Sequence, residues 1–188
     1  MIELEILVEI NELYEKAKSK LSKYNFTKET LMEDIYFYDP LRQNLKPNEI
    51  GKTFECLRIR NYDNESKITY KQDVYEKDVW QYSNENEISV DNFKEAEHIF
   101  NCLGLKKLLT IRNKRRFYIY NNYEIVLEKV DDLGTFLEVE YKGTLKETQI
   151  VQEKNKIWEF IKSLGLQTSN ELNAGKPELY IIKHNIKV

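Results

Sequence analysis

Apolar and polar residues alternate strictly in two stretches that lie far apart in the chain. In residues 2–10, every even position is aliphatic and three of the four odd positions are glutamate. In residues 134–143, a leucine and a valine alternate with two further glutamates. Because successive side chains of a strand point to opposite sides, each stretch predicts a strand with one apolar face and one acidic face.

The same patterns divide the remaining chain into further strands and a few helices, with hairpin turns at Asp63-Asn64 and Asn121-Asn122. The predicted strands are residues 2–10, 31–39, 53–62, 66–75, 79–89, 106–120, 123–130 and 134–143. The predicted helices are residues 11–24, 90–104 and 146–164, followed by a short helix or an extended tail. These elements predict an α+β fold in which eight largely antiparallel strands close into a barrel with flanking helices. We expect one domain over residues 1–188, with the barrel in about residues 1–145 and a helical segment in about residues 146–188.

The charged residues of these strands also gather on single faces. Arg58 and Arg60 share one face of their strand, opposite two aliphatic residues, and Lys71 follows the same logic. In the strand 106–120, one face carries Arg112, Lys114 and Arg116. If the apolar faces pack against the helices, the charged faces line the barrel interior, which is costly unless water, metal ions and a polyanion fill it. The alternative is that these are solvated outer faces around a small apolar core, and the pattern alone leaves both open.

Composition narrows the possible partners. The formal net charge is only −3 although 32% of the residues are charged, so neither a nucleic-acid-binding tail nor a basic membrane patch is indicated. No apolar run is long enough to span a membrane, and the chain begins with a predicted strand rather than a signal peptide. Cys56 and Cys102 lie in apolar patterns without zinc-ligand spacing, so we expect two reduced core thiols in a cytoplasmic protein.

The order and spacing of several motifs together resemble a known family. The motifs are an N-terminal Glu-x-Glu, "EDIYFYD", "CLRIR", "ITYK", the basic strand 106–120 and "VLEKVDDLGTFLEVE". In this order they resemble the CYTH family, named for class IV adenylyl cyclases and thiamine triphosphatases, which are triphosphate tunnel metalloenzymes. The resemblance covers nearly the whole chain. It implies an eight-stranded antiparallel tunnel that binds a triphosphate and a divalent metal, Mg²⁺ or Mn²⁺.

The resemblance also implies roles for individual residues. By position, the metal ligands are Glu3, Glu5, Glu87, Glu138 and Glu140. Glu3, Glu5 and Glu128 are candidates for catalysis, through the metal or through the attacking water. The phosphate-binding residues are Arg58, Arg60, Lys71, Arg112, Lys114 and Arg116. Two assignments stay open, because Glu85 competes with Glu87 for its position and Arg115 could replace Arg116 if a β-bulge intervenes.

One position departs from the family pattern. The lysine expected at the end of the first motif, Glu-x-Glu-x-Lys, is Leu7 in this chain. Losing one charge-assisted contact costs about 1.5–3 kcal/mol. An arginine that the family often has before the acids of strand 79–89 is also absent, with Ser83 near that position. The leucine at position 7 does not change the predicted fold, but it makes a loss of catalytic activity one of the possible interpretations.

The expected substrate is a triphosphate-containing small molecule such as tripolyphosphate, ATP or thiamine triphosphate, and the resemblance allows a homodimer. We favour metal-dependent hydrolysis of tripolyphosphate or an organic triphosphate, because no motif in the sequence reads adenine. The first alternative is a class IV adenylyl cyclase that converts ATP to cyclic AMP and pyrophosphate. The second is a non-catalytic triphosphate-binding protein, suggested by Leu7. A barrel with no ligand is the remaining interpretation.

Overall fold

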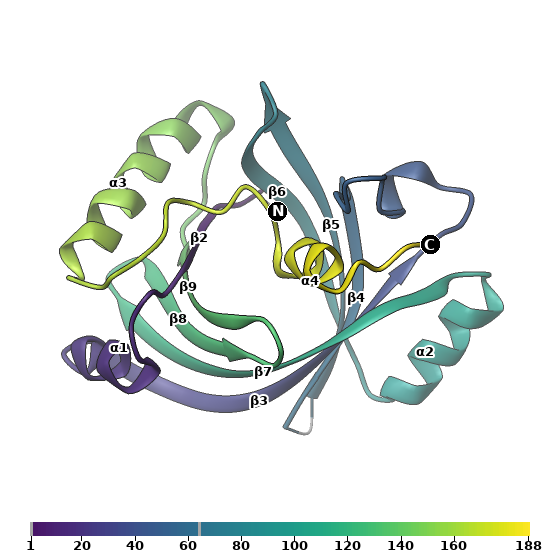
Figure 1. The fold of residues 1–188 in the computed structure, drawn as a ribbon, viewed down its shortest axis with the longest axis horizontal. Helices are drawn as coiled ribbons and strands as arrows, with labels where there is room; N and C mark the ends of the chain where they lie inside the picture. Colours follow the sequence, from purple (N-terminus) through teal and green to yellow (C-terminus); the bar gives the residue numbers. More distant parts are fainter. Residues whose placement is uncertain (1, 64) are drawn as a thin grey trace.

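The computed structural model describes residues 2–63 and 65–188, which form a nearly closed antiparallel barrel with helices around it (Figure 1). Within the described residues there are nine strands, in the order β1-β6-β5-β4-β3-β7-β8-β9-β2. Their bounds are β1 Ile2–Glu3, β2 Glu5–Glu9, β3 Asn25–Tyr38, β4 Glu55–Tyr62, β5 Glu65–Glu76, β6 Val79–Val90, β7 Lys106–Tyr120, β8 Tyr123–Val130 and β9 Gly134–Tyr141. The predicted barrel is confirmed, and the ninth strand arises because the first predicted strand is interrupted at Leu4.

This interrupted strand joins the two edges of the sheet. β1 pairs with β6 and β2 pairs with β9, so the first strand closes the barrel. The C-terminal segment fills the remaining seam between β2 and β6. The Leu172 amide donates a hydrogen bond to the carbonyl oxygen of Leu7. On the other side of the seam, Asn173 accepts a hydrogen bond from the Trp80 amide at 2.6 Å.

The helices cover the apolar faces of the strands, as the alternation predicted. Their bounds are α1 Tyr14–Leu21, α2 Phe93–Cys102, α3 Ile150–Ser163 and α4 Lys176–His184, with short 3-10 turns η1 Gln43–Leu45 and η2 Glu147–Gln149. α1 and α3 pack on the aliphatic face of β2, β8 and β9 in one cluster. α2 packs on Ile35, Phe37 and Ile59 of β3 and β4. The charged faces of the strands that these helices cover, such as β2, β4 and β9, are therefore left to the barrel interior.

α4 differs from the other helices because it lies over one end of the barrel (Figure 1). Its Ile181 is buried in a cluster with Leu7, Tyr36 and Phe136 from the barrel. Glu178 fixes the helix to the loop before β4, since its carboxylate accepts a hydrogen bond from the Thr53 amide at 2.8 Å. This end of the barrel is therefore closed by the C-terminal segment.

Two details differ from the sequence predictions. β3 begins at Asn25, six residues before the predicted start at residue 31, because its first half is polar on both faces and shows no apolar alternation. Cys102 is exposed at the end of α2, and only Cys56 is partly buried in the barrel wall. No helix in residues 2–63 or 65–188 is long and apolar enough to cross a membrane.

Candidate active site

The charged faces of the strands line a cavity of about 350 Å³ inside the barrel. Of the twelve predicted site residues, those that line it are Glu3, Glu5, Arg58, Arg60, Lys71, Glu87, Glu138 and Glu140. The cavity is thus walled by bases from β4 and β5 and by acids from β1, β2, β6 and β9. The interpretation of the charged faces as solvated outer faces is wrong for these strands.

Arg58 on β4 is the least satisfied base of this cavity. Its side chain is only 8% exposed, and its Nε atom has no hydrogen-bond partner among the described residues. A buried guanidinium without such partners is unfavourable by about 1–3 kcal/mol or more, unless an anion meets it. Of the bases in this cavity, Arg58 is therefore the one that would be stabilised most by an anionic ligand.

Arg60, two residues further along the same face, is already paired. Its Nε and Nη2 atoms donate to the two carboxylate oxygens of Asp34 at 2.7 and 2.8 Å. Burial alone would raise the pKa of Asp34, but the Arg60 guanidinium outweighs it and holds that pKa well below its usual range. Asp34 is therefore a permanent anion that fixes the orientation of Arg60 at the cavity wall.

The prediction that Arg112, Lys114 and Arg116 line the interior is wrong. They lie on the outer face of β7, where Arg112 pairs with Glu33 at 2.7 Å, and Lys114 and Arg116 pair with Glu29 at 2.7 and 2.9 Å. Both acids belong to β3: Glu29 lies before the predicted start of that strand at residue 31, and Glu33 lies within the predicted strand. The bases on the outer face of β7 are explained by these two acids rather than by a ligand.

Arg115 is the base that β7 contributes to the cavity, as the open alternative allowed. It is 3% exposed, and its Nη2 atom donates to Glu138 at 2.7 Å. Its Nε atom lies 3.5 Å from Glu128. Glu128 itself is fully buried behind the lining, so its position does not support the predicted catalytic role.

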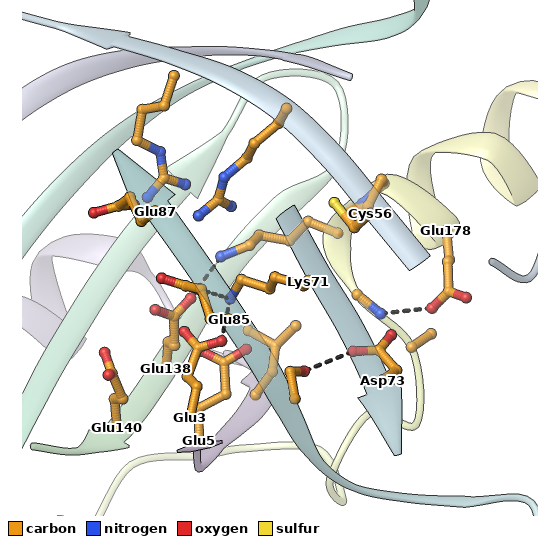
Figure 2. A pocket seen from close by; sticks show the side chains of 18 of the residues that line it. Glu3, Glu5, Cys56, Lys71, Asp73, Glu85, Glu87, Glu138, Glu140 and Glu178 are labelled. Atoms are coloured by element: carbon orange, nitrogen blue, oxygen red, sulfur yellow. Dashed lines mark hydrogen bonds and ion pairs between the residues drawn. The ribbon is translucent and has the colours of Figure 1, made fainter. Parts of the chain in front are cut away.

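The acids gather on the opposite wall, where Figure 2 shows Glu3, Glu5, Glu85 and Glu138 near the Lys71 ammonium. Lys71 pairs with Glu3 and, at 2.9 Å, with Glu85. Glu87 lies further along β6 and accepts from Lys67 at 2.7 Å. Glu85 therefore belongs to the centre of this acidic wall, and Glu87 to its edge.

Glu5 and Glu140 are acids whose negative charge the protein does not stabilise fully when they are ionised. They face each other across β2 and β9. Within the described chain, no basic side chain forms an ion pair with Glu5, and burial together with Glu138 and Glu3 raises its pKa well above the usual value. Burial and the nearby Glu3 raise the pKa of Glu140 to about 7, although Lys142 donates to it at 2.9 Å. A cation at this wall would remove the unfavourable charge.

Carboxylates of this kind are the hard oxygen ligands that Mg²⁺ and Mn²⁺ prefer. Within residues 2–63 and 65–188, no three acidic, histidine or cysteine side chains are arranged to hold a metal ion by themselves. Mg²⁺ commonly uses one or two carboxylates together with phosphate oxygens and water. The acidic wall fits that mode of binding, in which the substrate completes the coordination.

Lys176, at the start of α4, was missed by the sequence analysis. Its Nζ atom lies 2.6 Å from both Glu128 and Glu138. Glu138 is the cross-strand partner of Leu7, the position where the family pattern has a lysine. The ammonium group of Lys176, which belongs to the C-terminal segment, therefore lies beside the position of Leu7. No local pattern marks Lys176, because only the tertiary fold brings it to the cavity.

Comparisons with known proteins agree with this geometry. The model of the CYTH domain matches residues 1–175. The chain belongs to the CYTH family. A protein of Methanocaldococcus jannaschii called "Putative adenylate cyclase" is 31% identical over 185 residues, which cover 95% of this chain and 98% of that protein. CYTH proteins include adenylyl cyclases and triphosphatases.

Solved structures of CYTH proteins share the fold. A Pyrococcus horikoshii protein is 26% identical, with a TM-score of 0.75 over 94% of this chain and 98% of its own. A Hippeastrum protein, described as a "putative adenylyl cyclase" with a dominant triphosphatase activity, is 18% identical, with a TM-score of 0.68 over 100% of this chain and 98% of its own. The second likeness concerns the fold alone.

Proposed function

We propose that this CYTH protein binds a triphosphate inside the barrel and hydrolyses it with Mg²⁺ or Mn²⁺. The observation that carries the proposal is the buried, incompletely bonded guanidinium of Arg58, which faces the uncompensated carboxylate of Glu5 across one cavity. In a phosphate chain with a bound divalent cation, the phosphate groups would pair with Arg58 and the cation with Glu5. Neither a purely apolar nor a purely cationic ligand satisfies both walls.

The basic residues are suited to holding the phosphate chain. Arg58 and Arg115 present planar guanidinium groups that can bind phosphate oxygens through two donors, while Lys71 and Lys176 supply compact charges. Arg115 and Lys176 are shared with Glu138, so phosphate oxygens compete with that carboxylate for the same donors. Catalysis of phosphoryl transfer depends mostly on such positioning and charge neutralisation.

The acidic wall is suited to holding the cation and the attacking water. Glu3, Glu5 and Glu140 would hold the metal, which when bound neutralises phosphate charge and makes bound water a better nucleophile. The remaining carboxylate oxygens can accept hydrogen bonds from a water molecule and orient it toward a phosphorus atom. In hydrolysis this water attacks the terminal phosphorus, the bond from that phosphorus to the bridging oxygen breaks, and orthophosphate and the shortened phosphate chain are released.

Lys176 favours an enzyme over a protein that only binds a triphosphate. The sequence raised the binding-only interpretation because Leu7 removes one lysine from the family pattern. In the structure, the Lys176 ammonium lies beside the same carboxylate, Glu138, that pairs with Leu7. An ammonium group is therefore present beside the position of the missing lysine, which supports turnover over binding alone.

Cyclisation of ATP is the second candidate, favoured by the 31% identity to the M. jannaschii protein and by its name. It would use the same walls but a different nucleophile. In that reaction the 3′-hydroxyl group of ATP attacks the α-phosphorus, and pyrophosphate leaves.

Phosphorus NMR distinguishes these functions. The purified chain is incubated separately with tripolyphosphate and ATP, in Mg²⁺ and in Mn²⁺. Glu5→Gln removes the uncompensated carboxylate, and Glu33→Gln, an outer-face acid, is the matched control. We expect orthophosphate from the wild type and Glu33→Gln, and little from Glu5→Gln. Pyrophosphate with a cyclic nucleotide signal would establish the cyclase instead, and unchanged substrates would rule out both enzymes.

A further inference from the structure

Three of the apolar side chains that line the cavity form a cluster of their own among its charged residues. They are Met32 on β3, Tyr62 on β4 and Phe117 on β7, which we call the inner shelf. Each is less than a tenth exposed, and together they form a small apolar cluster with Val126 behind them. Phosphate binding makes no use of apolar side chains in a lumen, so the inner shelf requires another explanation.

The inner shelf lies directly beyond the phosphate-binding bases. Tyr62 follows Arg60 by two residues on β4, and Phe117 follows Arg115 by two residues on β7, so each ring continues the same inner face. Cross-strand pairing places Met32 beside Tyr62. These positions lie toward the 62–65 and 120–123 hairpins, whereas α4 and the segment before it cover the opposite end.

A triphosphate held by these arginines would therefore direct any attached group toward the inner shelf. The surroundings of the shelf are suited to a flat ring. The Lys28 Nζ atom lies 5.0 Å from the Tyr62 ring centroid and 5.3 Å from that of Phe117, so a cation already rests against the two rings. The Met32 thioether is a polarizable group that packs well against aromatic surfaces.

We propose that the inner shelf binds a planar aromatic group carried by the triphosphate, such as a nucleoside base. This inference rests on the proposed function and narrows it, because it selects an organic triphosphate over tripolyphosphate. An inorganic chain gains nothing from contact with these apolar side chains. An aromatic ring that stacks on Phe117 or Tyr62 would contact the small part of each ring that faces the cavity.

Calorimetric titration of the full chain with ATP and with tripolyphosphate, each in EDTA and in Mg²⁺, tests this inference. Phe117→Leu and Tyr62→Leu remove one ring each from the inner shelf. Phe100→Leu is the matched control, because Phe100 is equally buried but packs between α2 and the barrel outside the cavity. We expect each shelf variant to weaken ATP binding roughly tenfold. Affinity for tripolyphosphate, and both affinities of Phe100→Leu, should stay within about twofold of the wild type.

The unaltered tripolyphosphate affinity also shows that the shelf variants are folded. Equal losses for the two ligands, or no loss for either, would overturn the aromatic subsite and leave triphosphate binding standing. Binding of tripolyphosphate without binding of ATP would have the same meaning. If the wild type binds neither ligand in either condition, the proposed function fails together with this inference.

Discussion

Both faces of β7 carry basic side chains, but those on the outer face are partly or largely exposed and paired, whereas Arg115 on the inner face is buried. On the outer face, Arg112 and Lys114 are largely exposed and each meets a carboxylate of β3. On the inner face, Arg115 is buried and shares Glu138 with Lys176. In the same cavity, the Nε atom of Arg58 on β4 has no hydrogen-bond partner among the described residues. The comparison teaches that the presence of charge on a strand does not mark a site, whereas buried charge that the protein leaves unbalanced does.

The largest expected effect separates Arg58 from Arg112. Arg58→Gln should lower the affinity for tripolyphosphate and the value of kcat/KM by about ten- to hundredfold, because a charge-assisted contact in a buried site is lost. Arg112→Gln should leave both unchanged. Phosphate-release kinetics with calorimetry measure the two quantities. Equal effects of the two substitutions would show that the inner and outer bases do not differ in function.

The next effect concerns Lys176, the lysine that α4 contributes to the cavity. Lys176→Met should lower kcat/KM by about tenfold or more, because the ammonium at Glu138 is lost. Leu7→Lys in the Lys176→Met background should recover part of that loss, since residue 7 lies opposite the same carboxylate. Lys183→Met on the exposed side of α4 serves as the control. If the double variant is no better than Lys176→Met, the ammonium of Lys176 does not stand in for the missing lysine.

A third expected effect concerns the fixing of α4 to the barrel. Burial raises the pKa of Glu178 to about 7 in the folded protein, so the folded state holds a proton that the unfolded chain has lost above about pH 4.5. The contribution of this residue to stability is therefore present at low pH and falls as the pH rises toward about 7, then levels off. We expect Glu178→Gln to remove about 2 kcal/mol of pH dependence between about pH 5.5 and pH 7.5.

Denaturant titrations of the wild type and Glu178→Gln across that pH range measure this difference. Because Asp73 faces the same cavity near Glu178, Asp73→Asn is measured in parallel to separate the two carboxylates. Parallel stability curves for the wild type and Glu178→Gln would show that Glu178 does not take up a proton on folding.

The smallest effect is expected on the outer face. Lys114→Gln removes one of the two cations around Glu29, at a position where the lysine is almost half exposed. Surface ion pairs of this kind contribute about 0–1 kcal/mol. The free energy of unfolding should therefore change by less than about 1 kcal/mol, and phosphate release should not change. A loss of activity in Lys114→Gln would mean that the outer face takes part in function after all.

The alternation of residues predicted the strands and their acidic faces, because successive side chains of a strand point to opposite sides. The closed barrel with these acids inside followed only when the resemblance to the CYTH family was added, since alternation alone left open which face lies inward. Glu3, Glu5, Glu138 and Glu140 were placed correctly for this reason. The inner face of β7 was not predictable in the same way, because both faces carry bases and the first half of β3 lacks alternation. Lys176 could not be found either, since its contact with Glu138 depends on how α4 folds back over the barrel.

The seam of the barrel has a consequence for how the chain folds. Residues 2–9 and the segment 167–178 meet there, so the seam is built from parts that are almost the whole chain apart. Contacts of such high sequence separation form slowly, after local hairpins such as β7-β8 have assembled. Because Glu5 and Lys176 belong to these two segments, we expect the curved sheet to form before its charged lining is complete. Protease or chaperone encounters during that interval would meet an open sheet whose future cavity is still exposed to solvent.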